Sequence, residues 1–279
     1  MRTDPMSRVP VSTAPISTAP VNRVPVTDAP PGALQRVLAP IVLGVVVIAA
    51  WQFLAGSGIV EAYLLPSPAA IGEQIVVFGP SMLSAAGITG LNALIGLVVG
   101  SLLGVLAALA GSSLKAIDGM LAPVVAVLAV IPIVALAPVL NTMFGADAQT
   151  GRQLIAGLAS FVPVFITTAR GLRQTQPVHR DLLHTYAASR GQIMRTITLR
   201  TAAPYTFTGI RLASSLAVIS ALVAEYFGGP RGGLGGLIST SAASSAYPRA
   251  WAYVVAAILL GLAFYLVTLA LEAAVSRRR

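Results

Sequence analysis

The sequence predicts an all-α, polytopic membrane protein with six transmembrane helices, and two observations support this prediction. The 279-residue chain is 56% hydrophobic and only 10% charged, and its mean hydropathy of +0.84 is far above that of a single soluble domain. Six apolar runs are long enough, or nearly long enough, to cross a bilayer. They cover residues 37–54, 83–111, 120–145, 154–169, 207–227 and 251–275. The fourth run is short unless Gln153 and Arg170 anchor its ends at the membrane surfaces.

Residues 1–35 form a separate segment, in which proline recurs at every fifth position from Pro5 to Pro30. Prolines at this density exclude regular helix and sheet, and the segment has too little apolar bulk to form a core. We expect a disordered cytoplasmic tail at 1–35, followed by a membrane domain at 36–279. A cleavable signal peptide is not expected, because the first apolar run begins only near Val37.

The basic residues predict how the chain is oriented in the membrane. With a cytoplasmic N terminus and six crossings, fifteen Lys and Arg residues lie on the inner side. The outer side holds three, which are Arg152, Arg231 and Arg249. Because basic residues accumulate in cytoplasmic loops, we expect a multi-pass protein with a cytoplasmic N terminus and a cytoplasmic segment at 181–200.

Small residues and prolines predict how two of the runs pack. Gly96, Gly100 and Gly104 recur every four residues in the second run, and such a ridge lets two membrane helices approach closely. The third run contains three prolines, which are Pro123, Pro132 and Pro138. We expect a kinked or broken third helix at the centre of the bundle. For any single proline, a bend that serves only helix packing is an equally good interpretation.

Polar side chains within the runs are candidates for lining a substrate path. A carboxylate close to a membrane helix is costly unless it is paired or hydrated, so Glu225 is a functional candidate. Its alternative is an interfacial carboxylate that caps the following glycine loop. Thr89 and Asn92 have an alternative as hydrogen-bond partners of a neighbouring helix. The candidates for the translocation path are Thr89, Asn92, Pro132, Asn141, Ser160, Thr167, Ser214, Ser220 and Glu225.

Missing residue types disfavour several function classes. The chain has no Cys and only two histidines, His179 and His184, so no metal site is expected. The glycine-rich stretch after the fifth run lacks the lysine of a phosphate-binding loop, since Lys115 is the only lysine. We therefore expect no cofactor. The net charge of +9 would suggest nucleic acid in a soluble protein, but these arginines lie between apolar runs, so we expect contact with a lipid bilayer and none with nucleic acid.

A self-contained secondary transporter or channel is the alternative function. Such proteins place ionisable groups within their spans, and the spans here carry almost none beyond Glu225 and Arg211. An intramembrane enzyme is a third class, but the spans offer few candidates for a nucleophile and a base.

The stretch at 181–211 is the longest polar, arginine-bearing interruption of the apolar pattern. Drawn as one helix, it has Leu182, Tyr186, Ile193 and Ile197 on a single face, with its arginines directed elsewhere. A cytoplasmic helix with an apolar face predicts a docking surface for a partner protein.

Seven short motifs, in order, are similar to those of the membrane permease subunits of bacterial ABC importers. They are LLPSP at 64–68, Thr89 with the glycines after it, IPIVALAP at 131–138, FVPVFITTARGL at 161–172, YAASRGQ at 186–192, TGIR at 208–211 and AEYFGGPRGGLG at 224–235. The chain resembles the branch that imports nitrate, sulfonates, taurine, bicarbonate, or thiamine and riboflavin precursors. This resemblance implies a type I importer bundle with a cytoplasmic coupling helix, and its core covers about residues 85–275.

The family's cytoplasmic signature begins with Glu-Ala-Ala, has a glycine six residues after the Glu, and ends near a Leu-Pro pair. Ala187 stands at the position of the glycine, and we expect it to stiffen the helix because alanine has the higher helix propensity. The residues that the resemblance assigns to coupling with the ATPase are Asp181, Leu182, Leu183, His184, Ala187, Ala188, Ser189, Arg190, Gly191, Met194 and Leu199.

The resemblance also implies a mechanism and partners. The chain would be a transport subunit of the bacterial inner membrane and not an enzyme, since ATP hydrolysis would reside in a separate ABC ATPase present in two copies. A second permease copy, forming a homodimer, would complete the path, and an extracytoplasmic binding protein would deliver the substrate. The implied substrate is a small organic or inorganic anion or a vitamin-precursor heterocycle.

Overall fold

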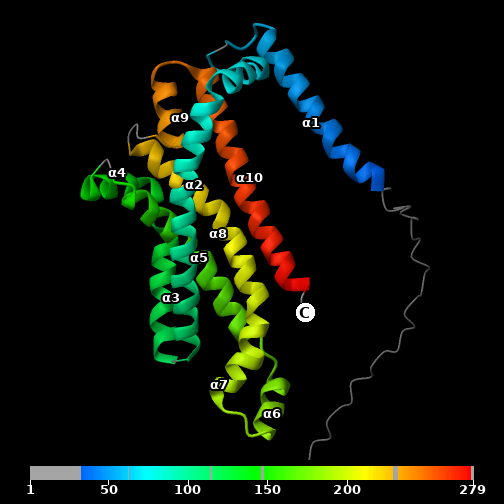
Figure 1. The fold of residues 1–279 in the computed structure, drawn as a ribbon, viewed down its shortest axis with the longest axis vertical. Helices are drawn as coiled ribbons and strands as arrows, with labels where there is room; N and C mark the ends of the chain where they lie inside the picture. The colour runs from blue at the N-terminus through cyan, green and yellow to red at the C-terminus, as the bar shows by residue number, and fades with distance from the viewer. Residues whose placement is uncertain (1–32, 62, 114, 146–147, 229–231, 278–279) are drawn as a thin grey trace, which may run out of the picture. The chain divides into compact units, whose positions relative to one another are not determined.

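The computed structural model describes residues 33–61, 63–113, 115–145, 148–228 and 232–277, and within these residues all regular structure is helical (Figure 1). The chain divides into two units within the first helix, α1 (Ala33–Gly56), after Val47. The predicted tail at 1–35 lies outside the described residues, except where α1 begins. All the sites discussed below belong to the second unit.

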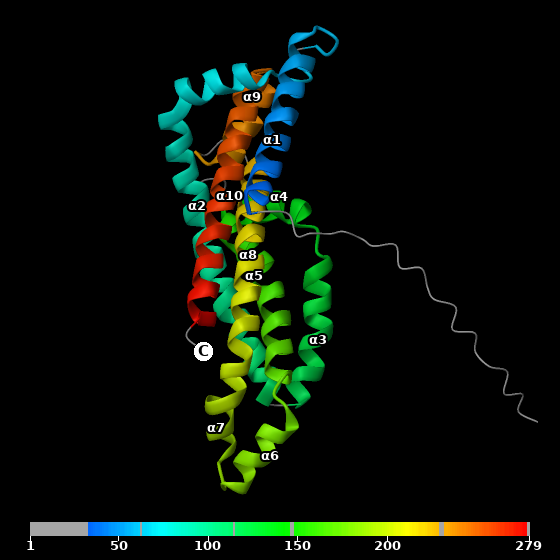
Figure 2. The same ribbon diagram turned by 90° about the vertical axis from the view of Figure 1, so that its right-hand side faces the viewer.

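Three long helices form the core of the second unit, namely α2 (Pro68–Ser113), α5 (Thr150–Arg173) and α8 (Leu199–Phe227). Figures 1 and 2 show them side by side, with α10 (Tyr247–Arg277) packed against α2 and α8. Small and branched apolar residues fill the space between them. These are Ala93, Leu97, Ala156, Val164, Ala213, Ala217, Val218 and Ala221. Alanines at these contacts let the helices approach closely, as is typical of helix packing in membranes.

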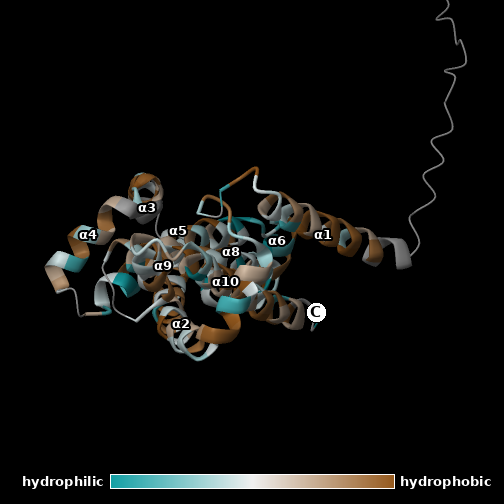
Figure 3. Cartoon of the chain, turned by 90° about the horizontal axis from the view of Figure 1, so that it is seen from above, coloured by the Kyte–Doolittle hydropathy of each residue, from teal (hydrophilic) through white to brown (hydrophobic). Residues whose placement is uncertain are grey.

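The prediction of a polytopic membrane protein is confirmed. Five helices of the described residues are long and apolar enough to cross a membrane, and a bent pair adds a sixth crossing if it is one span. Figure 3 shows apolar residues on the outer side of α2, where Leu91, Val98 and Leu102 are more than half exposed. A surface of this kind is stable against lipid or against another membrane helix.

The third apolar run is broken into α3 (Lys115–Val130) and α4 (Ile133–Phe144), which meet at 98°. The break falls at Pro132, which precedes α4 in an extended conformation, whereas Pro123 and Pro138 lie inside the two helices without ending them. The expected break is therefore present. The prediction that this run lies at the bundle centre is wrong, because α2, α5 and α8 fill the centre and α3 and α4 lie at the edge (Figures 1 and 2).

The glycines of the second run lie where α2 crosses α5. A Cβ added at Gly104 would come within 2.9 Å of the backbone oxygen of Phe161. One added at Gly96 or Gly100 would overlap backbone atoms of Gly157. The two backbones are thus in direct contact, and glycine is required at these crossings.

The polar segment folds as a hairpin of three short helical pieces, which we call the coupling hairpin (residues 177–198). These are α6 (Pro177–Thr185), α7 (Arg190–Ile193) and the π-helix η1 (Met194–Thr198). The stretch at 181–211, which was drawn as one helix, is not continuous, because α6 ends at Thr185. The turn that follows breaks the predicted common face.

Two local features explain the turn. Ala187 has φ = 53°, a left-handed conformation that an α-helix does not contain, so the expectation that it stiffens a helix is also wrong. Ser189 and Gln192 then form a reciprocal capping box, in which the Ser189 N–H donates to Gln192 Oε1 at 2.7 Å. This pair starts a new helix at Arg190.

Candidate functional site

A buried carboxylate, Glu225, lies near the end of α8 with 1% of its surface exposed. Its Oε2 accepts hydrogen bonds from Thr89 Oγ1 on α2 at 2.7 Å and from the Gly235 N–H at 3.2 Å. Its Oε1 accepts a longer bond from Asn92 Nδ2 at 3.4 Å. Three donors from two other helices therefore converge on one side chain of α8.

The same cluster holds the start of α9 (Leu234–Ala243). Thr89 Oγ1 accepts a hydrogen bond from the Leu234 N–H at 2.9 Å while it donates to Glu225. A Cβ at Gly235 would lie 2.8 Å from the Cβ of Glu225, so only glycine lets the start of α9 approach α8 this closely. The start of α9 thus brings two backbone N–H groups, those of Leu234 and Gly235, onto the buried pair of Thr89 and Glu225.

The network continues into the beginning of α5. Asn92 Nδ2 donates to Gln149 Oε1 at 2.8 Å, and Gln153 Nε2 donates to Asn92 Oδ1 at 3.2 Å. Arg152, which is fully buried, donates from Nη1 to the same Gln149 oxygen at 2.8 Å. Gln153, a candidate anchor for the end of the fourth run, thus bonds through its side-chain amide to α2. We call Thr89, Asn92, Gln149, Arg152, Gln153 and Glu225 the polar network.

Burial of Glu225 is tolerable because its carboxylate accepts hydrogen bonds from Thr89, Asn92 and the Gly235 N–H. A buried carboxylate without such partners would cost several kcal/mol. Sequence reasoning found Thr89, Asn92 and Glu225 but not Gln149 and Arg152. Polar residues at the start of an apolar run were the available signal, and their partners lie 57 to 136 positions away along the chain.

The other candidates for the path are mostly turned into the protein. Ser160 is fully buried and donates to the Ala156 carbonyl of its own helix at 2.7 Å. Ser214 donates likewise to Arg211 O at 2.7 Å. Ser220 and Asn141 are buried and Thr167 is half-buried, while Pro132 is exposed at the α3–α4 break. Seven of the nine candidates are therefore buried within a single copy of the chain.

Polar groups also join α8 to α10 closer to the coupling hairpin. Arg211 Nε lies 3.0 Å from Glu272 Oε2, and Thr208 Oγ1 donates to Glu272 Oε1 at 2.7 Å. Both charged side chains are less than one-third exposed. They fix α10 against the half of α8 that begins at the hairpin.

The coupling hairpin exposes apolar side chains on one side of α6. Val178 and Leu182 are one helical turn apart and are 70% and 54% exposed, and Tyr186 just after the helix is 75% exposed. We call these three residues the docking face. Val178 was missed by the sequence reasoning because it precedes the motif. Large apolar side chains exposed on a polar hairpin are typical of a protein-binding surface.

The residues assigned to coupling divide between two surfaces. Those exposed are Asp181, Leu182, His184, Ala187, Ser189, Arg190, Gly191 and Leu199, while Leu183 and Ala188 are half-buried. Met194, in contrast, packs against the buried cluster that includes Ala108, Phe165 and Leu172. Ile193 is 8% exposed, although it was expected on the same face as Leu182. The hairpin is therefore held against the bundle by η1, whereas most residues of α6 and of the turn are exposed.

Comparisons with known proteins agree with this architecture. A probable ABC transporter permease protein of Haemophilus influenzae is 30% identical over 71% of this chain and 80% of its own length. The formylaminopyrimidine transport permease protein of Halalkalibacterium halodurans is 28% identical over 71% of this chain and 78% of its own length. A putative aliphatic sulfonates transport permease protein of Bacillus subtilis is 28% identical over 69% of this chain and 70% of its own length.

A solved structure shares the fold. The crystal structure of an amino acid ABC transporter with histidines matches with a TM-score of 0.57 and 16% identity, covering 74% of this chain and 97% of that one. The family model described as binding-protein-dependent transport system inner membrane component matches residues 100–279, which is more than half of the chain. The chain therefore belongs to this family, and it is an inner-membrane permease subunit of an ABC importer.

Proposed function

We propose that this permease is driven by a separate ATPase subunit through the coupling hairpin, and that ATP hydrolysis resides entirely in that partner. The observation that carries the proposal is the docking face, where Val178, Leu182 and Tyr186 expose apolar surface on a helical hairpin. An amphipathic helix of this kind binds by laying its apolar side into a groove. The partner therefore presents an apolar groove to α6.

The η1 helix transmits the movement to the bundle. The chain continues from η1 directly into α8. Met194 of η1 packs against a buried cluster that includes Ala108 of α2 and Phe165 of α5. A displacement of α6 by a closing ATPase thus pulls on α8, and transport becomes a shift in the populations of two bundle states.

A charge placed on the docking face tests this contact. Leu182→Glu puts a carboxylate into the groove, where loss of a buried apolar anchor costs roughly 2 kcal/mol or more, about thirtyfold in affinity. The measurement is ATPase affinity for the full-length permease in detergent, with ATP-driven uptake in liposomes as a second readout. The matched control is Ile59→Glu, which changes another highly exposed apolar residue. Equal affinity of the two variants would refute docking through α6.

The coupling hairpin and the N terminus are assigned to the cytoplasm. This orientation is supported by the fifteen Lys and Arg residues that it places on the inner side, against three on the outer side. Two of the three outer arginines, Arg152 and Arg249, belong to the beginnings of α5 and α10. Cysteine accessibility provides a test, since the chain contains no Cys. A single cysteine at Thr185 should be labelled only from inside the cell.

The translocation path is assigned to the space between two permease copies, a homodimer, with two ATPase subunits and an extracytoplasmic binding protein. Burial of the polar network within one copy supports this assignment, because a substrate cannot reach those side chains without parting α2, α5 and α8. The network instead positions the start of α9. Thr167 and Pro132, which are less buried, remain the better path candidates.

The substrate is assigned to small anions of the nitrate, sulfonate or taurine type or to heterocyclic vitamin precursors. Relatives named for formylaminopyrimidine and for aliphatic sulfonates support this range. Uptake of these two classes of compound by cells that express the complete transporter tests the assignment. Uptake of neither class, with ATPase activity intact, would contradict it.

A further inference from the structure

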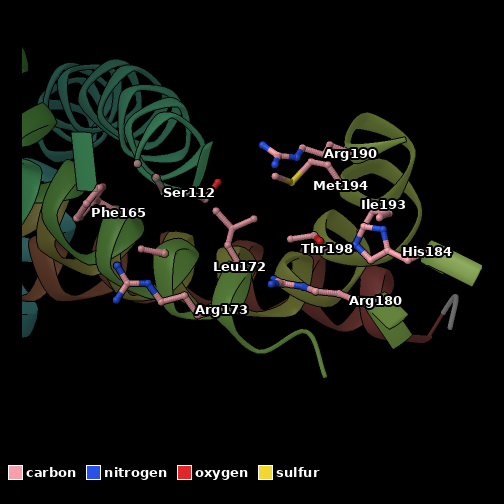
Figure 4. A pocket seen from close by; sticks show the side chains of 13 residues that line it. Ser112, Phe165, Leu172, Arg173, Arg180, His184, Arg190, Ile193, Met194 and Thr198 are labelled. Carbon is pink, nitrogen blue, oxygen red and sulfur yellow. The ribbon is translucent and has the colours of Figure 1, made fainter. Parts of the chain in front are cut away.

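A cavity of about 530 Å³ opens between the coupling hairpin and the ends of α2 and α5 (Figure 4). Its thirteen lining residues come from α2, α5, α6, α7 and η1. Three of its lining residues, His184, Arg190 and Met194, were expected to couple to the ATPase, but Val178, Leu182 and Tyr186 of the docking face do not line it. The cavity lies at the end of two helices that are long and apolar enough to cross a membrane, and therefore at a membrane surface.

The rim of the cavity is basic. Arg180, His184 and Arg190 line it together with Arg173, and the described lining residues include no carboxylate. Figure 4 shows the Arg180 and Arg190 side chains extending from the hairpin in the same direction, toward Ser112 and Leu172. Two guanidinium groups directed into one cavity create a positive potential that favours an anion.

The floor of the same cavity is apolar. Phe165, Leu172, Ile193 and Met194 line it beside the basic groups. A free inorganic anion gains nothing from such a surface, whereas an amphiphile with an anionic headgroup uses both parts. The combination therefore selects an anionic amphiphile.

The cavity is separate from the docking face. Residues two positions apart on an α-helix point about 200° away from each other. Arg180 and His184 each follow a docking-face residue, Val178 and Leu182, by two positions. A partner bound to the docking face thus leaves the basic side of α6 directed at the cavity.

We propose that this cavity binds the phosphate headgroup of an anionic phospholipid, with Arg180 and Arg190 as its ligands. Basic pockets between membrane helices at the cytoplasmic surface suit lipid phosphates, and arginine binds phosphate oxygens through paired N–H groups. The bound lipid bridges α6 and α7 to α2 and α5. The proposal rests on the proposed cytoplasmic orientation of the hairpin and does not depend on the ATPase contact.

Lipid titration of the full-length permease tests the proposal. Phosphatidylglycerol or phosphatidylcholine is added to the protein in detergent, and bound lipid is counted by native mass spectrometry. The pocket variant is Arg180→Gln with Arg190→Gln. The control variant, Arg195→Gln with Arg200→Gln, removes the same charge from exposed arginines of the same segment that do not line the cavity.

The pocket variant should bind phosphatidylglycerol about thirtyfold more weakly, since each arginine contributes roughly a factor of five. The control variant should bind like the unmodified chain, and phosphatidylcholine should bind equally weakly to all three. Equal losses in the two variants would overturn the proposal, as would no loss in either. Displacement of the lipid by excess inorganic phosphate would assign the site to soluble phosphate and overturn the lipid assignment. Unchanged melting temperatures show that the variants are folded.

Discussion

Ala187 occupies a conformation that its side chain disfavours, and replacing it with glycine should stabilise the coupling hairpin. With φ = 53°, its Cβ approaches the following carbonyl, whereas glycine adopts this region freely. The turn is otherwise well bonded, since the Ala187 N–H donates to His184 O at 2.9 Å and the Ala188 N–H to Leu183 O at 3.0 Å. The substitution therefore removes strain without removing a hydrogen bond.

The size of the effect follows from two opposing terms. A left-handed conformation costs a non-glycine residue roughly 1–2 kcal/mol. Against this, glycine gives the open chain more conformational freedom than alanine does, which lowers the stability of the closed hairpin by about 0.4–1 kcal/mol. The net gain for Ala187→Gly is therefore about 1 kcal/mol, which is a factor of about five in the equilibrium between the closed and open hairpin.

Amide hydrogen exchange of the full-length permease measures this equilibrium at the hairpin itself. Peptides that cover α6 and α7 should exchange about fivefold more slowly in Ala187→Gly. The matched control is Ala188→Gly, because Ala188 is not among the residues with positive φ and should gain nothing. Faster exchange in Ala187→Gly, or an equal change in both variants, would refute the strain at Ala187.

Three further substitutions test other parts of the structure. Gly100→Ala forces a Cβ into the α5 backbone and should lower stability by about 1–3 kcal/mol, whereas Gly87→Ala, which meets nothing within 4 Å, should not lower the melting temperature in detergent. Glu225→Ala leaves buried donors without an acceptor and should cost about 3 kcal/mol or more, with faster amide exchange at the start of α9. The control Glu73→Ala, an exposed carboxylate of α2, should leave that exchange unchanged. Ser189→Ala removes the capping box and should accelerate exchange in α7 by about fivefold; unchanged exchange would show that the cap is dispensable.

Composition and local pattern were sufficient for the class of the fold. A continuous run of about 20 apolar residues is typical of a membrane helix, in which every backbone group finds its partner within the same segment. The same local reasoning predicted a kink or break in the third run, without choosing among its three prolines, and close packing at the glycines of α2. Each of these predictions used only residues that lie within a few positions of one another in the sequence.

The features that sequence reasoning missed depend on distant residues or on rare conformations. The bonds from Thr89 to Glu225 and from Asn92 to Gln149 join positions that no periodic pattern relates. The turn at Ala187 was hidden because alanine has high helix propensity and gives no turn signal. The capping pair after it, Ser189 and Gln192, was readable as a helix start, and it would have divided the predicted helix into two.

The central claim is that this permease moves solute only when a partner ATPase drives it. The most direct test uses liposomes containing the full-length chain, loaded inside with ATP or with no nucleotide, and supplied outside with an aliphatic sulfonate or formylaminopyrimidine. Alone, the permease should accumulate neither compound. With its ATPase and binding protein, it should accumulate substrate only when ATP is present on the hairpin side. Accumulation by the permease alone, without nucleotide, would contradict the account.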